Sequence, residues 1–282
     1  MSVIQQGSTW KSFERVKNLF IFGDSYSSVG FGNKLNNPDE LDPLGIEFPG
    51  LTYNEPKLPN WVGHLITKYC PPPRFDPQYV QQSEEYHKEP LLVYDYAVGG
   101  DRVLGVRGQV HNRYLRGPGA KPEGSTWTAE NSLFVTWVGI NDCAFAQKHA
   151  KNMETLFGLQ EDLYQSGARN FLFVDVPPVN RSPAAPAGLE RSPSIENWNE
   201  ELAKAIKAFV EVHQDISAFF FSSSELFTKV LDNPEEYGFT EKDKRKAGGS
   251  IWADRLHPTS KVHDLIAKEV GEFLSSIECS TS

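Results

Sequence analysis

Five short apolar runs alternate along the chain with helical segments, and this alternation limits the available folds more than any other feature. The runs are "NLFIF" (18–22), "LLVYDYAV" (91–98), "SLFVTWVG" (132–139), "NFLFVDV" (170–176) and "SAFFF" (217–221). Short apolar runs that lead into turns are typical of parallel strands buried on both faces. Strands that alternate with helices form a parallel sheet covered on both sides. The sequence therefore predicts a three-layer α/β/α sandwich with a mostly parallel five-stranded sheet.

The segments between these runs complete the predicted organisation. Helices are predicted over residues 59–70, 143–166, 195–213 and 259–276. The chain has 282 residues, enough for one large α/β domain with a buried core, and we expect a single domain over residues 1–282. Stretches rich in Gly, Pro and polar residues predict long loop insertions near 30–59, 71–90 and 177–193.

Polar residues follow the predicted strands where a ligand would bind. In parallel sheets, ligands bind beyond the carboxyl ends of the strands. The first strand ends in "GDS" (23–25), the second in "GGD" (99–101) and the third in "GIND" (139–142). Near the C-terminus, "DRLHP" (254–258) precedes the last predicted helix. These four segments therefore hold the candidate functional residues.

The residue types in these segments are those that acyl transfer by a serine requires. Ser25 is a nucleophile only if an imidazole takes its proton and a carboxylate holds that imidazole, and His257 and Asp254 are candidates for these roles. The oxyanion formed on attack needs hydrogen-bond donors. Gly100 can expose its backbone N–H, Asn141 can donate from its side-chain amide, and Ser25 can donate its own N–H.

Simpler roles are open for each of these residues taken alone. Ser25 can be a turn or helix-cap serine, Asn141 a turn residue, and Asp254 with His257 a surface pair. The presence of all the parts in one chain favours catalysis. Asp24 is expected to bond backbone amides and hold the turn, because an anion beside a developing oxyanion would oppose the reaction.

The order of the four segments resembles that of the GDSL-type, or SGNH, hydrolases. The blocks stand as "FGDSYSS", "YAVGGDR", "WVGINDC" and "DRLHP", and the match spans residues 18–258. More narrowly, "KNLFIFGDSYSSVGF" with "PNWVGHL" resembles fungal acetylesterases of carbohydrate esterase family 16. The resemblance implies a flavodoxin-like SGNH hydrolase fold. It also implies Ser25 as nucleophile, His257 as base and Asp254 as its partner, with Gly100, Asn141 and Ser25 forming the oxyanion hole.

The same resemblance implies a serine esterase that needs no metal or organic cofactor. Its expected substrates are small acyl esters, above all acetyl esters of carbohydrates, cleaved through an acyl-serine intermediate. A lipid-ester or thioester hydrolase on the same triad is an alternative. A non-catalytic carbohydrate-binding protein of the same fold is an alternative from another class. Neither the acyl length nor the identity of the alcohol follows from the sequence.

Three further sequence features bear on the site. Phe31 and Trp252 lie close in sequence to the candidate segments and are predicted to form substrate-contacting walls. A metal site using Asp254, His257 and His263 is conceivable, but no HExxH motif or Cys cluster supports it, and none is expected. The GxSxG motif of α/β-hydrolases is absent, because Ser27 stands where the second glycine would be.

Charge and apolar content exclude some partners. The net charge is −9 and the pI about 5.3, which disfavours a general nucleic-acid-binding face. No apolar run approaches the length of a membrane span. We expect neither a nucleic-acid partner nor a membrane span. We also expect a monomer that acts on a small-molecule or oligosaccharide ester.

The sequence leaves the compartment open. The N-terminus shows no basic-then-apolar leader, so the chain is cytoplasmic or a secreted mature form. The odd number of cysteines (Cys70, Cys143 and Cys279) leans towards a reducing compartment, whereas the single sequon at Asn180 leans the other way. Whether any two cysteines are bonded and whether Asn180 is glycosylated stay open.

Overall fold

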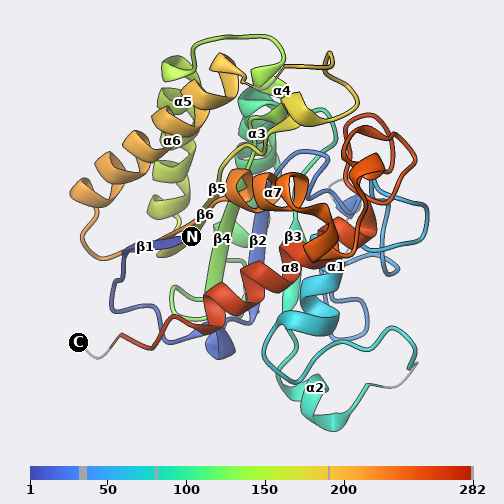
Figure 1. The fold of residues 1–282 in the computed structure, drawn as a ribbon. Helices are drawn as coiled ribbons and strands as arrows, with labels where there is room; N and C mark the ends of the chain where they lie inside the picture. The colour runs from blue at the N-terminus through green and yellow to red at the C-terminus, as the bar shows by residue number, and fades with distance from the viewer. Residues whose placement is uncertain (32–36, 80–81, 190, 281–282) are drawn as a thin grey trace.

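A six-stranded sheet forms the centre of the computed structural model, which describes residues 1–31, 37–79, 82–189 and 191–280 (Figure 1). Its order is β1-β6-β5-β4-β2-β3, and only β1 pairs antiparallel, with β6. The strands are β1 (Ser2–Gln5), β2 (Asn18–Gly23), β3 (Leu92–Asp95), β4 (Ser132–Trp137), β5 (Asn170–Val174) and β6 (Ser217–Phe221). Each predicted loop insertion includes a stretch (32–36, 80–81 or 190) that lies outside the described residues.

The central strands are apolar because both of their faces are covered. Every residue of β2, β4 and β5 is buried. Phe20 of β2 shows how densely the core is filled, since its ring lies 4.7–5.5 Å from the rings of Tyr94, Tyr114, Trp127 and Phe134. Aromatic rings at such separations add specific edge and stacking contacts to the burial of apolar area.

Helices cover the two faces of the sheet (Figure 1). On one face α5 packs against α3 and α6, and on the other α8 packs against α1. The helices are α1 (Trp61–His64), α2 (Glu84–Lys88), α3 (Val103–Gly108), α4 (Ile140–Cys143), α5 (Ala150–Gln165), α6 (Pro193–Val212), α7 (Ser223–Asp232) and α8 (Ser260–Ser275). The α/β/α class predicted from the alternation of elements is therefore confirmed.

The differences from the predicted elements have local causes. The sheet has a sixth strand, β1, which escaped detection because it has only four residues, none of them buried, and therefore no apolar run. The predicted helix over 143–166 begins only at Ala150, as α5. A separate short helix, α4, ends at Cys143, and residues 144–149 lie between the two. Helix α7 was missed inside an apparently polar loop. Its serine-rich start hides an apolar stripe of four buried residues, Leu226, Phe227, Val230 and Leu231.

The structure shows the surroundings of the cysteines and of the sequon asparagine, Asn180. All three cysteines are unpaired, with Cys70 buried and Cys279 exposed. The Asn180 side chain is buried and donates a hydrogen bond to the Leu189 carbonyl oxygen (3.0 Å).

In the described parts of the chain, no helix is both long and apolar enough to cross a bilayer.

Truncating Phe20 tests whether its aromatic cluster stabilises the core. We expect Phe20→Ala to lower the free energy of unfolding by about 3–5 kcal/mol, because the buried ring is replaced by a cavity. Denaturant titration followed by tryptophan fluorescence measures the change. Val212→Ala, at an exposed position of α6, is the matched control and should shift the free energy by less than about 0.5 kcal/mol. Equal losses in the two variants would contradict the assignment.

Candidate active site

The turn that follows β2 presents Ser25 at the carboxyl end of the sheet. Gly23 is required there, because a Cβ at this position would lie 2.2 Å from the backbone oxygen of Trp137. The Asp24 carboxylate accepts a hydrogen bond from the Tyr26 N–H (3.1 Å) and so holds the turn, as predicted. No acceptor in the described ranges is bonded to the N–H of Ser25. This N–H is therefore available to a bound group.

His257 links Ser25 to Asp254. Its Nε2 lies 2.9 Å from Ser25 Oγ, and its Nδ1 lies 2.7 Å from Asp254 Oδ2. The other carboxylate oxygen of Asp254 accepts the N–H groups of Leu256 and His257, each at 2.7 Å. Partial burial would raise the pKa of Asp254, but these hydrogen bonds outweigh it and lower the pKa. The carboxylate is therefore ionised at neutral pH and selects the His257 tautomer with hydrogen on Nδ1.

Further contacts fix the loop that carries His257. The Tyr26 hydroxyl donates to the Leu256 carbonyl oxygen (2.8 Å), which ties this loop to the turn that carries Ser25. The Ala253 N–H donates to the His257 carbonyl oxygen (2.9 Å). Helix α8 then begins at once, with the Thr259 side chain capping it through the Val262 N–H. The imidazole is thus positioned from both sides of the loop.

The two glycines after β3, Gly99 and Gly100, are needed for different structural reasons. The Asp101 N–H donates to the Val98 carbonyl oxygen, which closes a turn with Gly100 at a φ of +81°. At Gly99 a Cβ would lie 1.9 Å from the Tyr53 hydroxyl oxygen, so the tyrosine ring requires a residue without a side chain. Within the described residues the Gly100 N–H has no hydrogen-bond acceptor, and it is therefore free to donate.

Asn141 follows β4 at the start of α4. Gly139 precedes it with a φ of +127°, and a Cβ there would lie 2.2 Å from the Trp198 indole. The Asn141 amide donates one hydrogen to the Asp101 carbonyl oxygen (3.0 Å). An amide nitrogen has two hydrogens, so one more is available to a bound oxygen. The contact with Asp101 also ties the Asn141 segment to the Gly100 segment.

Gln109 connects the Gly23 segment to the Asp101 segment through its side-chain amide. The sequence analysis did not identify this residue. Its side-chain oxygen accepts the Gly23 N–H (2.9 Å), and its nitrogen donates to the Gly23 carbonyl oxygen (2.8 Å). The same nitrogen donates to the Asp101 carboxylate (2.8 Å). The residue lies after α3, in a stretch without any motif, so no sequence signal identified it.

Three carboxylates lie near one another behind these segments. Burial raises the pKa of Asp24 to about 7; the Tyr26 N–H opposes this increase, and the nearby Asp142 and Asp101 add to it. Burial likewise raises the pKa of Asp142 to about 6. One Asp24 oxygen, Oδ2, has no hydrogen-bond partner among the described residues, so no donor there stabilises a negative charge on it.

The two predicted wall residues do not face a substrate. Trp252 has an exposed fraction of 0%, and its indole N–H donates to the Lys244 carbonyl oxygen (2.9 Å). Phe31 has an exposed fraction of 5%, because its ring packs edge-on against Tyr94 and Tyr96. Their prediction rested on closeness in sequence, which carries no information about the direction of a side chain. Both residues belong to the core.

An exposed aromatic residue that the sequence analysis did not single out, Tyr53, lies beside His257. It belongs to the loop between β2 and α1, and 44% of its surface is exposed. Its ring centroid lies 5.2 Å from that of His257. The tyrosine stands in a loop without periodicity, so the sequence offered no reason to place it beside the imidazole.

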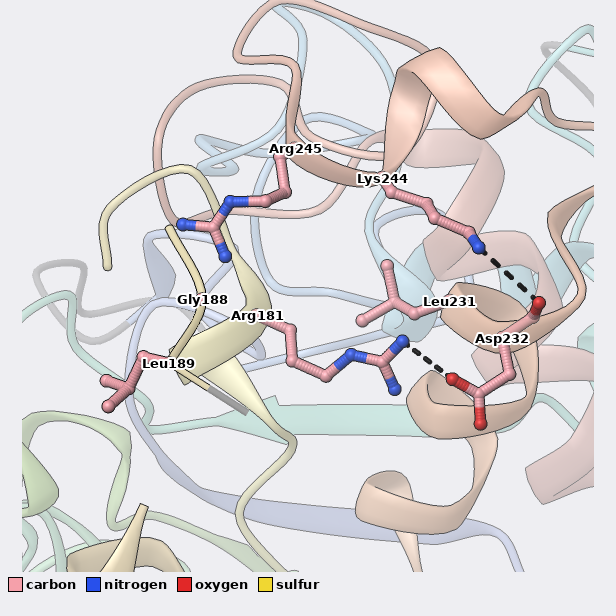
Figure 2. Close-up of a pocket in the computed structure, with 7 residues that line it drawn as sticks. All are labelled: Arg181, Gly188, Leu189, Leu231, Asp232, Lys244 and Arg245. Carbon is pink, nitrogen blue, oxygen red and sulfur yellow. Dashed lines mark hydrogen bonds and ion pairs between the residues drawn. The ribbon is translucent and has the colours of Figure 1, made fainter. Parts of the chain in front are cut away.

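A separate surface pocket of about 400 Å³ has basic walls (Figure 2). Arg181 forms an ion pair with Asp232 (2.6 Å), and Lys244 donates to the backbone oxygen of the same residue (3.5 Å). Arg245 donates to the Ala185 carbonyl oxygen. These cations are therefore engaged in joining the 177–189 loop and the segment around residue 244 to the end of α7. None of the candidate catalytic residues lines this pocket.

His263, which the alternative metal site would include, lies in the core of the protein. In the described ranges, no three His, Cys, Asp or Glu side chains are grouped to hold a metal ion. His263 is buried beside the ring of Tyr26, with 6.2 Å between ring centroids. Burial lowers its pKa to about 3, so this imidazole is neutral.

Comparison with known proteins defines the class. Residues 19–270 match the family model of GDSL-like lipases and acylhydrolases. The chain therefore belongs to this family, and the protein is a carboxylic ester hydrolase.

One curated relative and two solved structures are similar to this chain. An acetylesterase from Thermothelomyces thermophilus is 30% identical over 91% of this chain and 87% of its own. A putative GDSL-like lipase from Parabacteroides merdae has a similar fold, with a TM-score of 0.58, 12% identity, and 96% of this chain and 99% of that chain covered. An acetyl-xylooligosaccharide esterase from Geobacillus stearothermophilus reaches a TM-score of 0.51 at 13% identity, over 98% and 99%.

Replacing Asp24 by Asn should produce a pH-dependent gain in stability. The folded pKa of about 7 lies above the ordinary value of 3.8, so the folded state keeps a proton that the unfolded chain releases. Stability of the native protein is therefore lost as the pH rises through that window. We expect the difference in unfolding free energy between Asp24→Asn and wild type to grow from about pH 4 to about pH 7, by up to about 4 kcal/mol, and then level off. Denaturant titration at several pH values measures it; a constant difference would contradict the burial argument.

Proposed function

We propose that the protein is a serine esterase that hydrolyses small acyl esters, acetyl esters in particular, of carbohydrates. The observation that carries the proposal is the continuous hydrogen-bonded series from Ser25 through His257 to Asp254. The name of the acetylesterase relative supports the acetyl group. The acetyl-xylooligosaccharide esterase among the similar folds is compatible with a sugar as the alcohol. We further propose that the protein acts as a monomer on a small-molecule or oligosaccharide ester.

In the first half of the proposed reaction, Ser25 Oγ attacks the ester carbonyl carbon. His257 Nε2 accepts the hydroxyl proton, and Asp254 stabilises the resulting imidazolium through Nδ1. The carbonyl oxygen becomes an oxyanion that accepts hydrogen bonds from the N–H groups of Ser25 and Gly100 and from the Asn141 amide. The tetrahedral intermediate then collapses, and the C–O bond to the alcohol breaks as His257 returns its proton to the leaving oxygen.

In the second half, water hydrolyses the acyl-serine. His257 takes a proton from the water molecule, whose oxygen attacks the acyl carbon. The same donors hold the second oxyanion. When the acid leaves, the proton returns from His257 to Ser25 Oγ, and the free enzyme is regenerated. Neither half requires a group that this chain lacks.

Substituting the proposed nucleophile separates an esterase from a binding protein of the same fold. We expect Ser25→Ala to lower kcat for para-nitrophenyl acetate by about 10⁴-fold or more, because no acyl-serine can form. Release of para-nitrophenol measures the rate. Ser276→Ala, at the C-terminal end of α8, is a matched control that should retain wild-type turnover. Equal rates for wild type and Ser25→Ala would refute the mechanism.

The proposed oxyanion donor on α4 has a distinct kinetic signature. We expect Asn141→Ala to lower kcat on the order of 100-fold with little change in KM, because its free amide hydrogen acts on the transition state. Steady-state kinetics on para-nitrophenyl acetate measure both constants, and Asn233→Ala, at the exposed C-terminal end of α7, is the comparison variant. A change confined to KM would assign Asn141 to ground-state binding instead.

A further inference from the structure

Tyr53 lies close to two parts of the candidate active site. Its ring lies at 34° to the imidazole of His257, with 5.2 Å between the ring centroids. On its other side, the hydroxyl end lies against the backbone of Gly99, next to the proposed donor Gly100. A single exposed aromatic side chain thus contacts the surroundings of both the proposed base and the proposed oxyanion hole.

The loop that carries Tyr53 is held in place by its neighbours. Just before it, the Leu51 N–H donates to the Val29 carbonyl oxygen (2.7 Å). Just after it, the buried Asn54 amide donates to the Leu58 carbonyl oxygen (2.9 Å), and Glu55 accepts the Ser260 N–H at the start of α8 (2.7 Å). The ring is therefore presented from an anchored loop, so little ordering is needed when a substrate binds.

The reaction mechanism determines which part of the substrate meets this ring. His257 must return its proton to the leaving alcohol, so the alcohol oxygen lies within hydrogen-bond reach of Nε2 in the transition state. The rest of the alcohol then lies beside the imidazole, next to which the Tyr53 ring also lies. The acyl group, by contrast, points away from the leaving oxygen across the carbonyl carbon.

The chemistry of tyrosine suits one class of alcohol. A sugar ring has a face of C–H groups and a rim of hydroxyls, and tyrosine offers an apolar ring with a polar tip. We propose that Tyr53 forms a subsite that binds the sugar ring carrying the ester, on the leaving-alcohol side of the site. This inference rests on the proposed esterase function and adds to it the residue that selects the alcohol.

Varying the alcohol and the acyl group separately tests the subsite. For one acyl group, ethyl acetate is compared with peracetylated methyl xyloside; for one alcohol, para-nitrophenyl acetate is compared with the butyrate. We expect Tyr53→Ala to lower kcat/KM for the xyloside about 5- to 10-fold more than for ethyl acetate, chiefly through KM. The ratio of acetate to butyrate turnover should stay within about twofold. Tyr53→Phe, which keeps the ring, should retain most of the xyloside preference.

Controls separate failure of the subsite from failure of the proposed function. Tyr79→Ala removes another exposed tyrosine, in the 71–90 insertion, and should leave both ratios unchanged. Equal losses on the xyloside and ethyl acetate, or an altered acetate-to-butyrate ratio, would overturn the subsite while the esterase stands. Absence of turnover by the wild type on every ester would overturn the proposed function as well. Circular dichroism of each variant verifies that the fold is retained.

Discussion

The arrangement of the site depends on how closely β2 and β4 approach at their carboxyl ends. Gly23 lies against the backbone of Trp137, with no room for a side chain, and the Gln109 amide holds both of its backbone polar groups. The same amide holds the Asp101 carboxylate. One buried side chain therefore connects the end of β2 to the segment that follows Gly100. Gln109 is a positioning residue in this sense, and its hydrogen bonds satisfy backbone groups that would otherwise be buried without partners.

Two aspartates close to Ser25 have opposite pKa shifts because their environments differ. Asp254 is partly exposed and accepts three hydrogen bonds, which keep its pKa low and its carboxylate charged. Asp24 is completely buried and accepts a backbone hydrogen bond from the Tyr26 N–H that does not offset this burial, so its pKa is raised to about 7. An ionised group beside His257 favours imidazolium, whereas a raised pKa at Asp24 reduces the negative charge behind Ser25 that would oppose an oxyanion. The two environments therefore shift the charges of the two aspartates in opposite directions.

Sequence reasoning succeeded where the information is local. The apolar runs predicted five of the six strands, and the polar residues at their ends predicted which segments meet at one edge of the sheet. It failed where the local pattern is weak or misleading: β1 is a four-residue edge strand with only two apolar residues, and α7 begins with serines because Ser222 caps it. It also failed for Trp252, whose closeness to Asp254 in the chain suggested a substrate wall although its indole points into the core.

The sequence by itself determined the fold class, the family and the identity of the residues at the strand ends, because each depends on short patterns in a fixed order. Only the tertiary structure decided which side chains surround Ser25. Gln109 and Tyr53 come from segments without a motif, and their contacts with Gly23, Gly99 and His257 depend on the path of the intervening chain. Local propensities leave that path open, since packing between distant segments determines it.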